Sequence, residues 1–332
     1  MIISCILLGV FFAWIDVNEL KGVLKTADYR YLSVALVLMF INRVLMPVKW
    51  NILLIAKDIH IAWFDAIRIY YISSFMGLYL PPTVGADSIR VYYTSKKKYP
   101  VSDIVASIIV ERIIGFLALI FFIIIGCFIL SSCFTDMNLK LHNLIFTSLT
   151  MSFLFVLFFF VSLNNFFIRI VETFLEKLFH RKWIGKSAVI AHKLFQSYAC
   201  YKTKKHFLIL FYVLTCIEVL MPVIISYIIA GALNVSVPLS FFFAFVPIVL
   251  FLIRLPISID GFGINEGGYI YFLSLMGVPE TLGFGVGIIN HFILLIGLLP
   301  GVFFYAFDKY KDYNQTKQKM TIPDTPIIQQ PR

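Results

Sequence analysis

"IIGFLALIFFIIIGCFIL", residues 113–130, runs for eighteen positions without a charged side chain and without a polar face. As a helix rising about 1.5 Å per residue it would be about 27 Å long, close to the roughly 30 Å hydrocarbon core of a bilayer. A helix on the surface of a soluble protein would instead carry polar residues along one side. The stretch therefore predicts a helix that crosses a membrane.

The composition of the whole chain agrees with this interpretation. Of its 332 residues, 60% are hydrophobic and only 14% are charged, whereas about 25% of the residues of a soluble domain are charged. Several apolar segments are short or interrupted, so we predict an all-α polytopic integral membrane protein with about 7–8 transmembrane helices. The apolar segments are 2–15, 31–48, 66–81, 104–131, 143–163, 206–230, 239–256, 267–278 and 283–306.

The basic residues predict how the chain is oriented. The net charge is +10, and Lys and Arg gather in residues 90–103, in residues 164–206 and after Asp308. Segments 132–142 and 231–238 together contain a single Lys and no Arg. Positive loops favour the cytoplasmic side, so we expect both basic loops and the C-terminus to be cytoplasmic, in a bacterial-type cytoplasmic (inner) membrane. Charges beside apolar spans indicate contact with anionic lipid rather than with nucleic acid.

A single transmembrane domain is expected over residues 1–308. Within it, "FFIRIVETFLEKLF" (166–179) places apolar side chains on one helical face and charges on the other. This pattern predicts a cytoplasmic amphipathic helix lying in the membrane interface over about 166–204, with a partner-docking helix as the alternative. Residues 309–332, where Pro occurs among Gln and Thr, predict a disordered cytoplasmic tail.

Ionisable residues inside apolar segments are the first candidates for function. Such a group costs about 2.5–3.5 kcal/mol on insertion scales, so it normally faces a cavity or a partner. Glu111 and Arg112 are adjacent and point about 100° apart on a helix, so we expect them to reach different partners. Glu218 has no opposite charge nearby in the sequence, so it is either paired across helices or protonated. Arg43 could extend beside Lys49, and Asn290 and His291 could be packing residues.

Two polar segments interrupt the apolar pattern, namely "LPPTVGADSIR" (80–90) and "RLPISIDGFGINEGG" (254–268). Short, broken segments in the two halves of a membrane protein are typical of a binding site formed by re-entrant helices, often in an inverted repeat. We therefore expect broken or re-entrant helices near 66–90 and 239–278 that line a polar cavity. The opposite charges of Arg90 and Glu266 suggest a salt bridge between the halves. The expected helix-break and turn residues are Pro81, Pro82, Gly85, Pro256, Gly261 and Gly263.

An ordered set of motifs supports a family resemblance. Pro81, Gly85 and Arg90 are followed by a basic loop with Lys96 to Lys98, and "KWNILL" (49–54) precedes them. A later span opens with Ser107, Glu111 and Arg112, and a loop before the last span contains Pro256, Gly261, Gly263 and Glu266. In these motifs the chain resembles the flippase-like membrane family related to the transmembrane region of lysylphosphatidylglycerol synthases. It shows no counterpart of their soluble aminoacyl-transferring domain, so we do not expect lysyl-lipid synthesis.

The resemblance implies movement of a lipid with a charged head group between leaflets. Candidate cargoes are an aminoacyl phospholipid, a glycolipid or a polyprenyl-phosphate-linked sugar. The arginines would contact phosphate, and the acidic residues would hold the arginines or receive a cationic head group. The candidate head-group and cavity residues are Arg90, Glu111, Arg112, Glu218, Arg254, Asp260, Asn265 and Glu266.

Two alternatives remain open at this stage. One is a membrane-embedded transferase that uses a lipid-phosphate donor, with Glu111 or Asp260 as base. The other is an accessory subunit of a cell-envelope glycan assembly complex, with a glycosyltransferase or another envelope-biosynthesis enzyme as partner. We predict no catalytic residues, no cofactor and no metal site, because the sequence has no metal-ligand cluster and its five cysteines are scattered without a CxxC pair.

Overall fold

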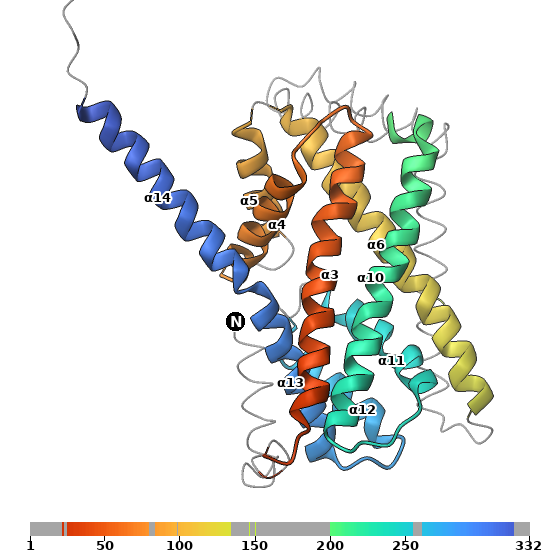
Figure 1. The fold of residues 1–332 in the computed structure, drawn as a ribbon. Coiled ribbons are helices and arrows are strands. Elements are labelled where there is room, and N and C mark those ends of the chain that lie inside the picture. Colours follow the sequence, from red (N-terminus) through yellow and green to blue (C-terminus); the bar gives the residue numbers. More distant parts are fainter. Residues whose placement is uncertain are drawn as a thin grey trace, which may run out of the picture.

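A computed structural model describes residue 22 and residues 25–79, 84–97, 99–133, 146, 150, 200–254 and 261–321. Within this part of the chain the regular elements are helices, arranged as an upright bundle from which one helix projects (Figure 1). They are α3 (Tyr29–Ile55), α4 (Trp63–Gly77), α5 (Val84–Ser95), α6 (Val101–Cys133), α10 (Lys205–Ala232), α11 (Leu239–Ile253), α12 (Ile264–Ser274), α13 (Glu280–Leu298), α14 (Pro300–Thr321) and a short 3₁₀ helix, Tyr201–Thr203.

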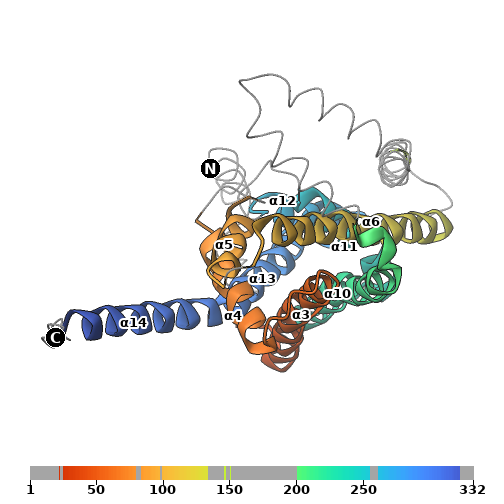
Figure 2. The same ribbon diagram turned by 90° about the horizontal axis from the view of Figure 1, so that it is seen from above.

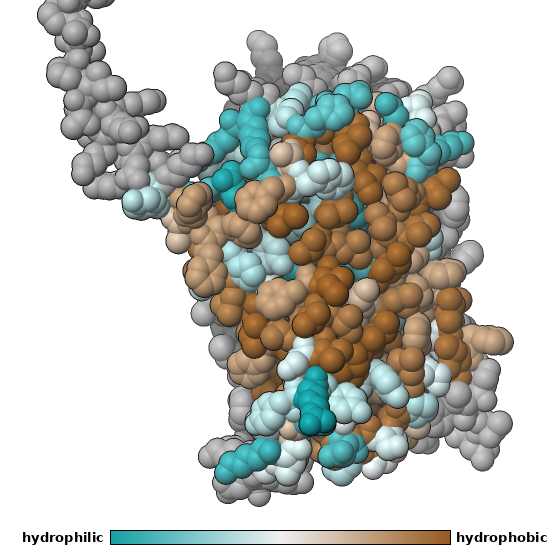
Figure 3. All heavy atoms as spheres, viewed as in Figure 1, coloured by the Kyte–Doolittle hydropathy of each residue, from teal (hydrophilic) through white to brown (hydrophobic). Residues whose placement is uncertain are grey.

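Four of the described helical stretches are long and apolar enough to cross a membrane: Tyr29–Ile55, Val101–Ile129, Lys205–Ala232 and Glu280–Tyr310. On the face seen in Figure 3, apolar side chains predominate between the two ends of the bundle. Both observations confirm an all-α membrane protein. The predicted span at 2–15 lies outside the described residues, and so does the predicted span at 143–163 apart from residues 146 and 150. Of the amphipathic helix predicted at about 166–204, only residues 200–204 are described.

Hydrogen bonds and ion pairs place the ends of the helices. At one end of the bundle the Asp28 backbone N–H donates to Ala232 O at 2.9 Å, so α3 starts where α10 ends. At the other end Lys57 Nζ lies 3.3 Å from Asp103 Oδ1, which joins the loop after α3 to the start of α6. We call this second end the basic end, because the lysines of the 96–97 and 202–205 segments belong to it.

Two helical hairpins enter the bundle from opposite ends (Figure 1). The α4–α5 hairpin lies in the half that adjoins the basic end, and the α11–α12 hairpin lies in the other half. A Cβ on Gly77 would lie 2.6 Å from the Ala86 Cβ, so glycine is what lets the first hairpin close. These hairpins confirm the prediction of broken or re-entrant helices. Their opposed directions are those expected of an inverted repeat.

The α11 helix of the second hairpin is largely buried. The α11 helix has 15 residues, too few to cross the hydrocarbon core. Its Phe245 ring stacks on Phe272 of α12, with centroids 5.2 Å apart, and meets Tyr269 edge to face at 5.4 Å. Gly126 of α6 lies against Ala244, where an added Cβ would be 2.6 Å from the carbonyl oxygen. Close packing on α6 and α12 therefore holds α11 inside the protein.

The C-terminal segment differs from the sequence-based expectation. A disordered tail was expected from residue 309, but α14 remains helical to Thr321 and projects away from the bundle (Figure 2). The helix can continue because residues 309–321 include good helix formers such as Lys and Gln, and no Pro or Gly occurs between residues 309 and 322. Residues 322–332 lie outside the described part.

Candidate functional site

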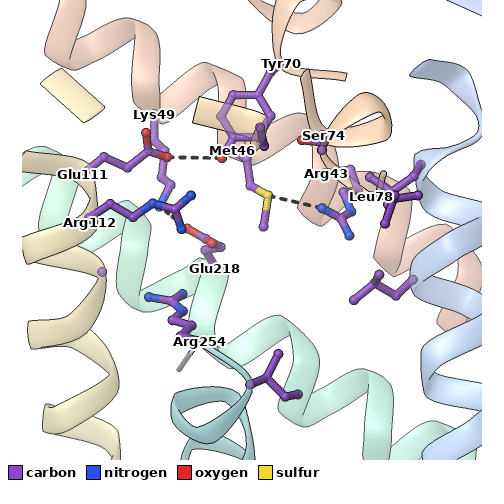
Figure 4. Close-up of a pocket in the computed structure, with 16 residues that line it drawn as sticks. Arg43, Met46, Lys49, Tyr70, Ser74, Leu78, Glu111, Arg112, Glu218 and Arg254 are labelled. Carbon is purple, nitrogen blue, oxygen red and sulfur yellow. Dashed lines mark hydrogen bonds and ion pairs between the residues drawn. The ribbon is translucent and has the colours of Figure 1, made fainter. Parts of the chain in front are cut away.

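A cavity of 330 Å³ lies where the inner ends of the two hairpins approach each other (Figure 4). Gly77, Leu78 and Ala86 of the first hairpin line it, together with Ile253 and Arg254 of the second. The predicted polar cavity between the broken segments is therefore present. The other lining residues come from α3, α4, α6, α10 and α13: Arg43, Met46, Lys49, Tyr70, Ser74, Glu111, Arg112, Gly115, Glu218, Leu294 and Leu298.

An ion pair between α3 and α10 forms part of the cavity lining. Lys49 and Glu218 are in direct contact, and their side chains are only 3% and 9% exposed. Lys49 Nζ also donates to Thr215 Oγ1 at 3.3 Å and lies over the ring of Phe211. The sequence left open whether Glu218 is paired across helices or protonated. In the structure it is paired with Lys49 of α3, a helix distant from α10 in the sequence.

A second ion pair joins the first hairpin to α6. Arg90 Nη1 donates to Glu111 Oε2 at 2.7 Å, and the Tyr70 hydroxyl donates to Glu111 Oε1 at 3.2 Å. The Arg90 guanidinium lies against the rings of both Trp50 and Tyr70, 4.9 Å from each centroid, and the two ring centroids are 6.3 Å apart. Arg90 and Glu111 are both buried. Because the aromatic rings and the carboxylate surround the guanidinium, this arginine has a fixed position.

Asp87 connects that pair to Arg112. Asp87 Oδ1 accepts from Arg90 Nη2 at 3.0 Å, and both Asp87 oxygens accept from Arg112 at 3.0–3.1 Å. The adjacent residues Glu111 and Arg112 thus reach different partners, as predicted from their helical spacing. The Arg112 side chain is 42% exposed, so it is held by Asp87 while remaining accessible.

The suggested salt bridge between Arg90 and Glu266 is wrong. Glu266 is fully buried, its Oε1 lies 2.9 Å from His291 Nδ1, and its Oε2 accepts from the Gly263 backbone N–H at 2.6 Å. Glu266 is the third residue of α12, so its carboxylate caps the first turn of its own helix. The two residues lie in different hairpins, and each has a partner close to its own helix.

A second cavity, of 140 Å³, continues from the first and reaches the polar core between α12, α13 and α10. Both cavities are lined by Arg43, Glu218 and Arg254.

Asn265 and Asn290 line the second cavity and are both hydrogen-bonded. Asn265 Nδ2 donates to Gly287 O at 2.9 Å, and Asn290 Nδ2 donates to the Ser226 and Tyr269 hydroxyls at 2.6 and 2.8 Å. His291 also lines this cavity and stacks on Phe262, with centroids 3.7 Å apart.

Arg254 differs from the other charged residues of the cavity. It follows the last residue of α11, and its guanidinium lies 5.7 Å from the centroid of the Phe116 ring. Among the described residues we find no carboxylate in ion-pair contact with it and no hydrogen bond to its side chain. A Cβ on Gly115 would lie 2.9 Å from Arg254 Nη1, so the glycine leaves the space that this guanidinium occupies.

The structure brings most of the predicted site residues together. Arg90, Glu111, Arg112, Glu218 and Arg254 line the first cavity or lie directly behind its wall. Asn265 and Glu266 belong to the second cavity and its supporting core. Of the turn residues, Gly85 is buried in the first turn of α5, and Gly261 and Gly263 have φ values of 82° and 85°, which favour glycine. Pro81, Pro82, Pro256 and Asp260 lie outside the described residues.

Three polar residues that hold the predicted site residues in place were not themselves predicted as site residues. Lys49 and Tyr70 provide partners for Glu218 and Glu111, and Asp87 holds two arginines. Lys49 could have been noticed as a second cation, directly after the apolar segment 31–48 that contains Arg43, and Asp87 as the acid three residues before Arg90. No feature of the sequence distinguishes Tyr70 from the other tyrosines.

The described residues of the cavity present net positive charge. Its lining includes four cationic side chains and two carboxylates, and Arg90 and Asp87 behind the wall balance each other. Within the described part of the chain no group of three His, Cys, Asp or Glu side chains could hold a metal ion. The arrangement is therefore suited to holding an anion by charge-assisted hydrogen bonds.

Comparison with known proteins agrees with the membrane fold and with the resemblance of the motifs. No curated protein sequence matches the chain. A family model described as the lysylphosphatidylglycerol synthase TM region matches residues 1–301, which include both hairpins, the spanning helices α3, α6 and α10, and all the charged residues of the cavity. Membership of this family indicates a role connected with membrane lipid. The chain belongs to the family of the lysylphosphatidylglycerol synthase transmembrane region.

Proposed function

We propose that the protein is a flippase-like translocator that moves a membrane lipid with a charged or phosphate-linked head group between leaflets. The main support is the position of the charged cavity, which lies between two opposed hairpins inside a bundle with an apolar outer face. A lipid head group crosses hydrocarbon only at high cost, because its charges lose their hydration there. A charged cavity inside the bundle replaces that hydration while the acyl chains stay in lipid.

The two hairpins provide the moving parts of this proposal. Each hairpin enters from one end of the bundle and ends at the cavity, as in transporters whose site lies at a repeat interface. A small displacement of one hairpin would open the cavity toward its own end. Alternating access would then require movement of the two hairpins around a fixed set of charges on α3, α6 and α10.

We further propose that the basic end faces the cytoplasm. The lysines of the 96–97 and 202–205 segments would lie next to the cytoplasmic leaflet, whose anionic lipids attract Lys and Arg. The positive charge at this end would also raise the local concentration of anionic lipid near the first hairpin. Cargo would then enter the cavity past α4 and α5.

The transferase alternative has less support from the site. A general base needs a carboxylate that can reach and accept a proton from its substrate. Both oxygens of Glu111 accept hydrogen bonds from Arg90 and Tyr70, and Glu218 is paired with Lys49. The carboxylates of the cavity therefore serve to hold cations in place, which agrees better with binding than with proton transfer.

Leaflet exchange in reconstituted vesicles tests the proposed function. Fluorescent phospholipids are placed in vesicles containing the wild-type protein, Ser74→Trp or Ser274→Trp, and quenching by dithionite reports the exchange between leaflets. Ser74 lines the cavity, whereas Ser274 is exposed at the end of α12 and provides a matched control. We expect exchange by the wild type and Ser274→Trp and a loss of most exchange in Ser74→Trp. Equal exchange by all three proteins, or none by the wild type with any lipid, would contradict the proposal.

A further inference from the structure

The net charge of the cavity indicates which charge a bound head group would carry. Among the described residues, four cations and two carboxylates line the cavity, which leaves an excess of two positive charges. Adding the residues directly behind the wall does not change the excess, because Asp87 and Arg90 carry opposite charges. A head group that enters this space therefore meets a net positive environment.

Both carboxylates of the cavity are already committed to cations of the protein. Glu218 is in contact with Lys49 inside the helix bundle, and Glu111 is held by Arg90 and Tyr70. A lipid with an ammonium group would have to displace one of these buried partners to find a counterion. Removing one partner from a buried ion pair is costly, because it leaves the other charge unpaired.

A cation is available for an anionic head group. In the described part of the chain Arg254 has neither an ion pair nor a side-chain hydrogen bond, and it faces both cavities. Arg112, on the neighbouring surface of α6, remains 42% exposed beside its contact with Asp87. Guanidinium groups bind phosphate through paired, charge-assisted hydrogen bonds, so Arg254 and Arg112 offer complementary donors to one phosphate group.

We infer that the cargo is a lipid whose head group carries phosphate and a net negative charge, with no free cationic group, and that Arg254 contacts the phosphate. This inference rests on the proposed function for the identity of the ligand as a lipid. It separates the candidate cargoes, because a cationic aminoacyl phospholipid is excluded while phosphate-linked lipids of the polyprenyl or glycerol type remain. Gly115 is part of the same site, because it leaves room for the Arg254 guanidinium.

The experiment compares lipids of different charge in binding and in exchange. Binding to the full-length protein in detergent is measured by native mass spectrometry with phosphatidic acid, phosphatidylcholine, lysylphosphatidylglycerol and inorganic phosphate. Leaflet exchange is measured for fluorescent versions of the same three lipids in phosphatidylcholine vesicles. The variants are Arg254→Gln, which removes the charge, and Gly115→Ala, which displaces the guanidinium and keeps the charge. Arg30→Gln, in the exposed first turn of α3, is the matched control.

We expect phosphatidic acid to bind at least about tenfold more tightly than lysylphosphatidylglycerol, as is typical when charge-assisted hydrogen bonds are gained. Arg254→Gln and Gly115→Ala should each weaken phosphatidic acid binding by about tenfold, and Arg30→Gln should leave it unchanged. Inorganic phosphate should bind more weakly than phosphatidic acid. Tighter binding of inorganic phosphate would identify a site for free phosphate and overturn the lipid assignment.

The outcomes separate this inference from the proposed function. Equal or tighter binding of lysylphosphatidylglycerol, or full binding of phosphatidic acid by both Arg254→Gln and Gly115→Ala, overturns the inference even if exchange is observed. Selective phosphatidic acid binding without exchange of any lipid contradicts translocation but supports the charge assignment. Selective binding together with selective exchange supports both.

Discussion

Arg90 Nη1 lies 2.7 Å from Glu111 Oε2, so one buried ion pair attaches the first hairpin to the spanning helix α6. The aromatic rings of Trp50 and Tyr70 pack on the arginine, and both members of the ion pair are buried. The pair is therefore a structural anchor for α5 as well as part of the cavity wall. Its role can be separated from that of Arg254, which contacts no described carboxylate.

Arg90→Met should destabilise the protein by about 3–5 kcal/mol, because it leaves Glu111 buried without its cation. The double variant Arg90→Met/Glu111→Leu should recover much of that loss, since no unpaired charge then remains. Unfolding in detergent, followed by circular dichroism against temperature or denaturant, measures both effects. Losses that simply add in the double variant would show that the two residues do not act as a pair.

The electrostatic potential of the cavity predicts which reagents enter it. In a background where the five cysteines are replaced by serine, Ser74→Cys should react about tenfold faster with an anionic than with a cationic methanethiosulfonate at low salt. The preference should shrink as salt rises, because ions screen the charges. Ser274→Cys is the control, as residues 267–279 contain no charged side chain.

A preference for the cationic reagent at residue 74, or the same preference at residues 74 and 274, would show that the cavity is not positive. The measurement uses initial rates of labelling in vesicles, which do not depend on any particular cargo.

Gly126→Ala should destabilise the protein by about 1–3 kcal/mol, because overpacking forces helices apart. The added Cβ would lie 2.6 Å from Ala244 O, so α11 must move away from α6. Gly231→Ala is the matched control, since its Cβ would lie 3.6 Å from the Tyr31 ring, an ordinary contact. Thermal unfolding of both variants in the same detergent checks the prediction, and an equal effect of the two substitutions would contradict the packing of α11 on α6.

The sequence predicted those parts of the fold that depend on local patterns. The apolar stretch 113–130 lies within α6. As expected, the polar segments 80–90 and 254–268 contain the breaks between the two helices of each hairpin. The different partners of Glu111 and Arg112 followed from their angular separation on one helix. Each of these features can be predicted from the spacing of residues along the chain and the thickness of the bilayer alone.

The sequence could not predict which distant helices become neighbours. Lys49 lies beside Glu218 only because α3 and α10 pack antiparallel, and no local pattern encodes that contact. The expected contact between Arg90 and Glu266 failed for the same reason. It was inferred from opposite charges alone, whereas each residue has a nearer partner, Glu111 and His291 respectively.

Photo-crosslinking tests the central claim, that a phosphate head group occupies the cavity, most directly. A phosphatidic acid analogue with a photoreactive group beside its phosphate is incorporated into vesicles with the wild-type protein, and labelled peptides are identified by mass spectrometry. We predict labelling of peptides that contain residues 74–78 and 253–254, and loss of that labelling when unlabelled phosphatidic acid is added in excess. Labelling restricted to the exposed outer faces of α3 and α6, or cavity labelling that excess lipid does not reduce, would contradict the account.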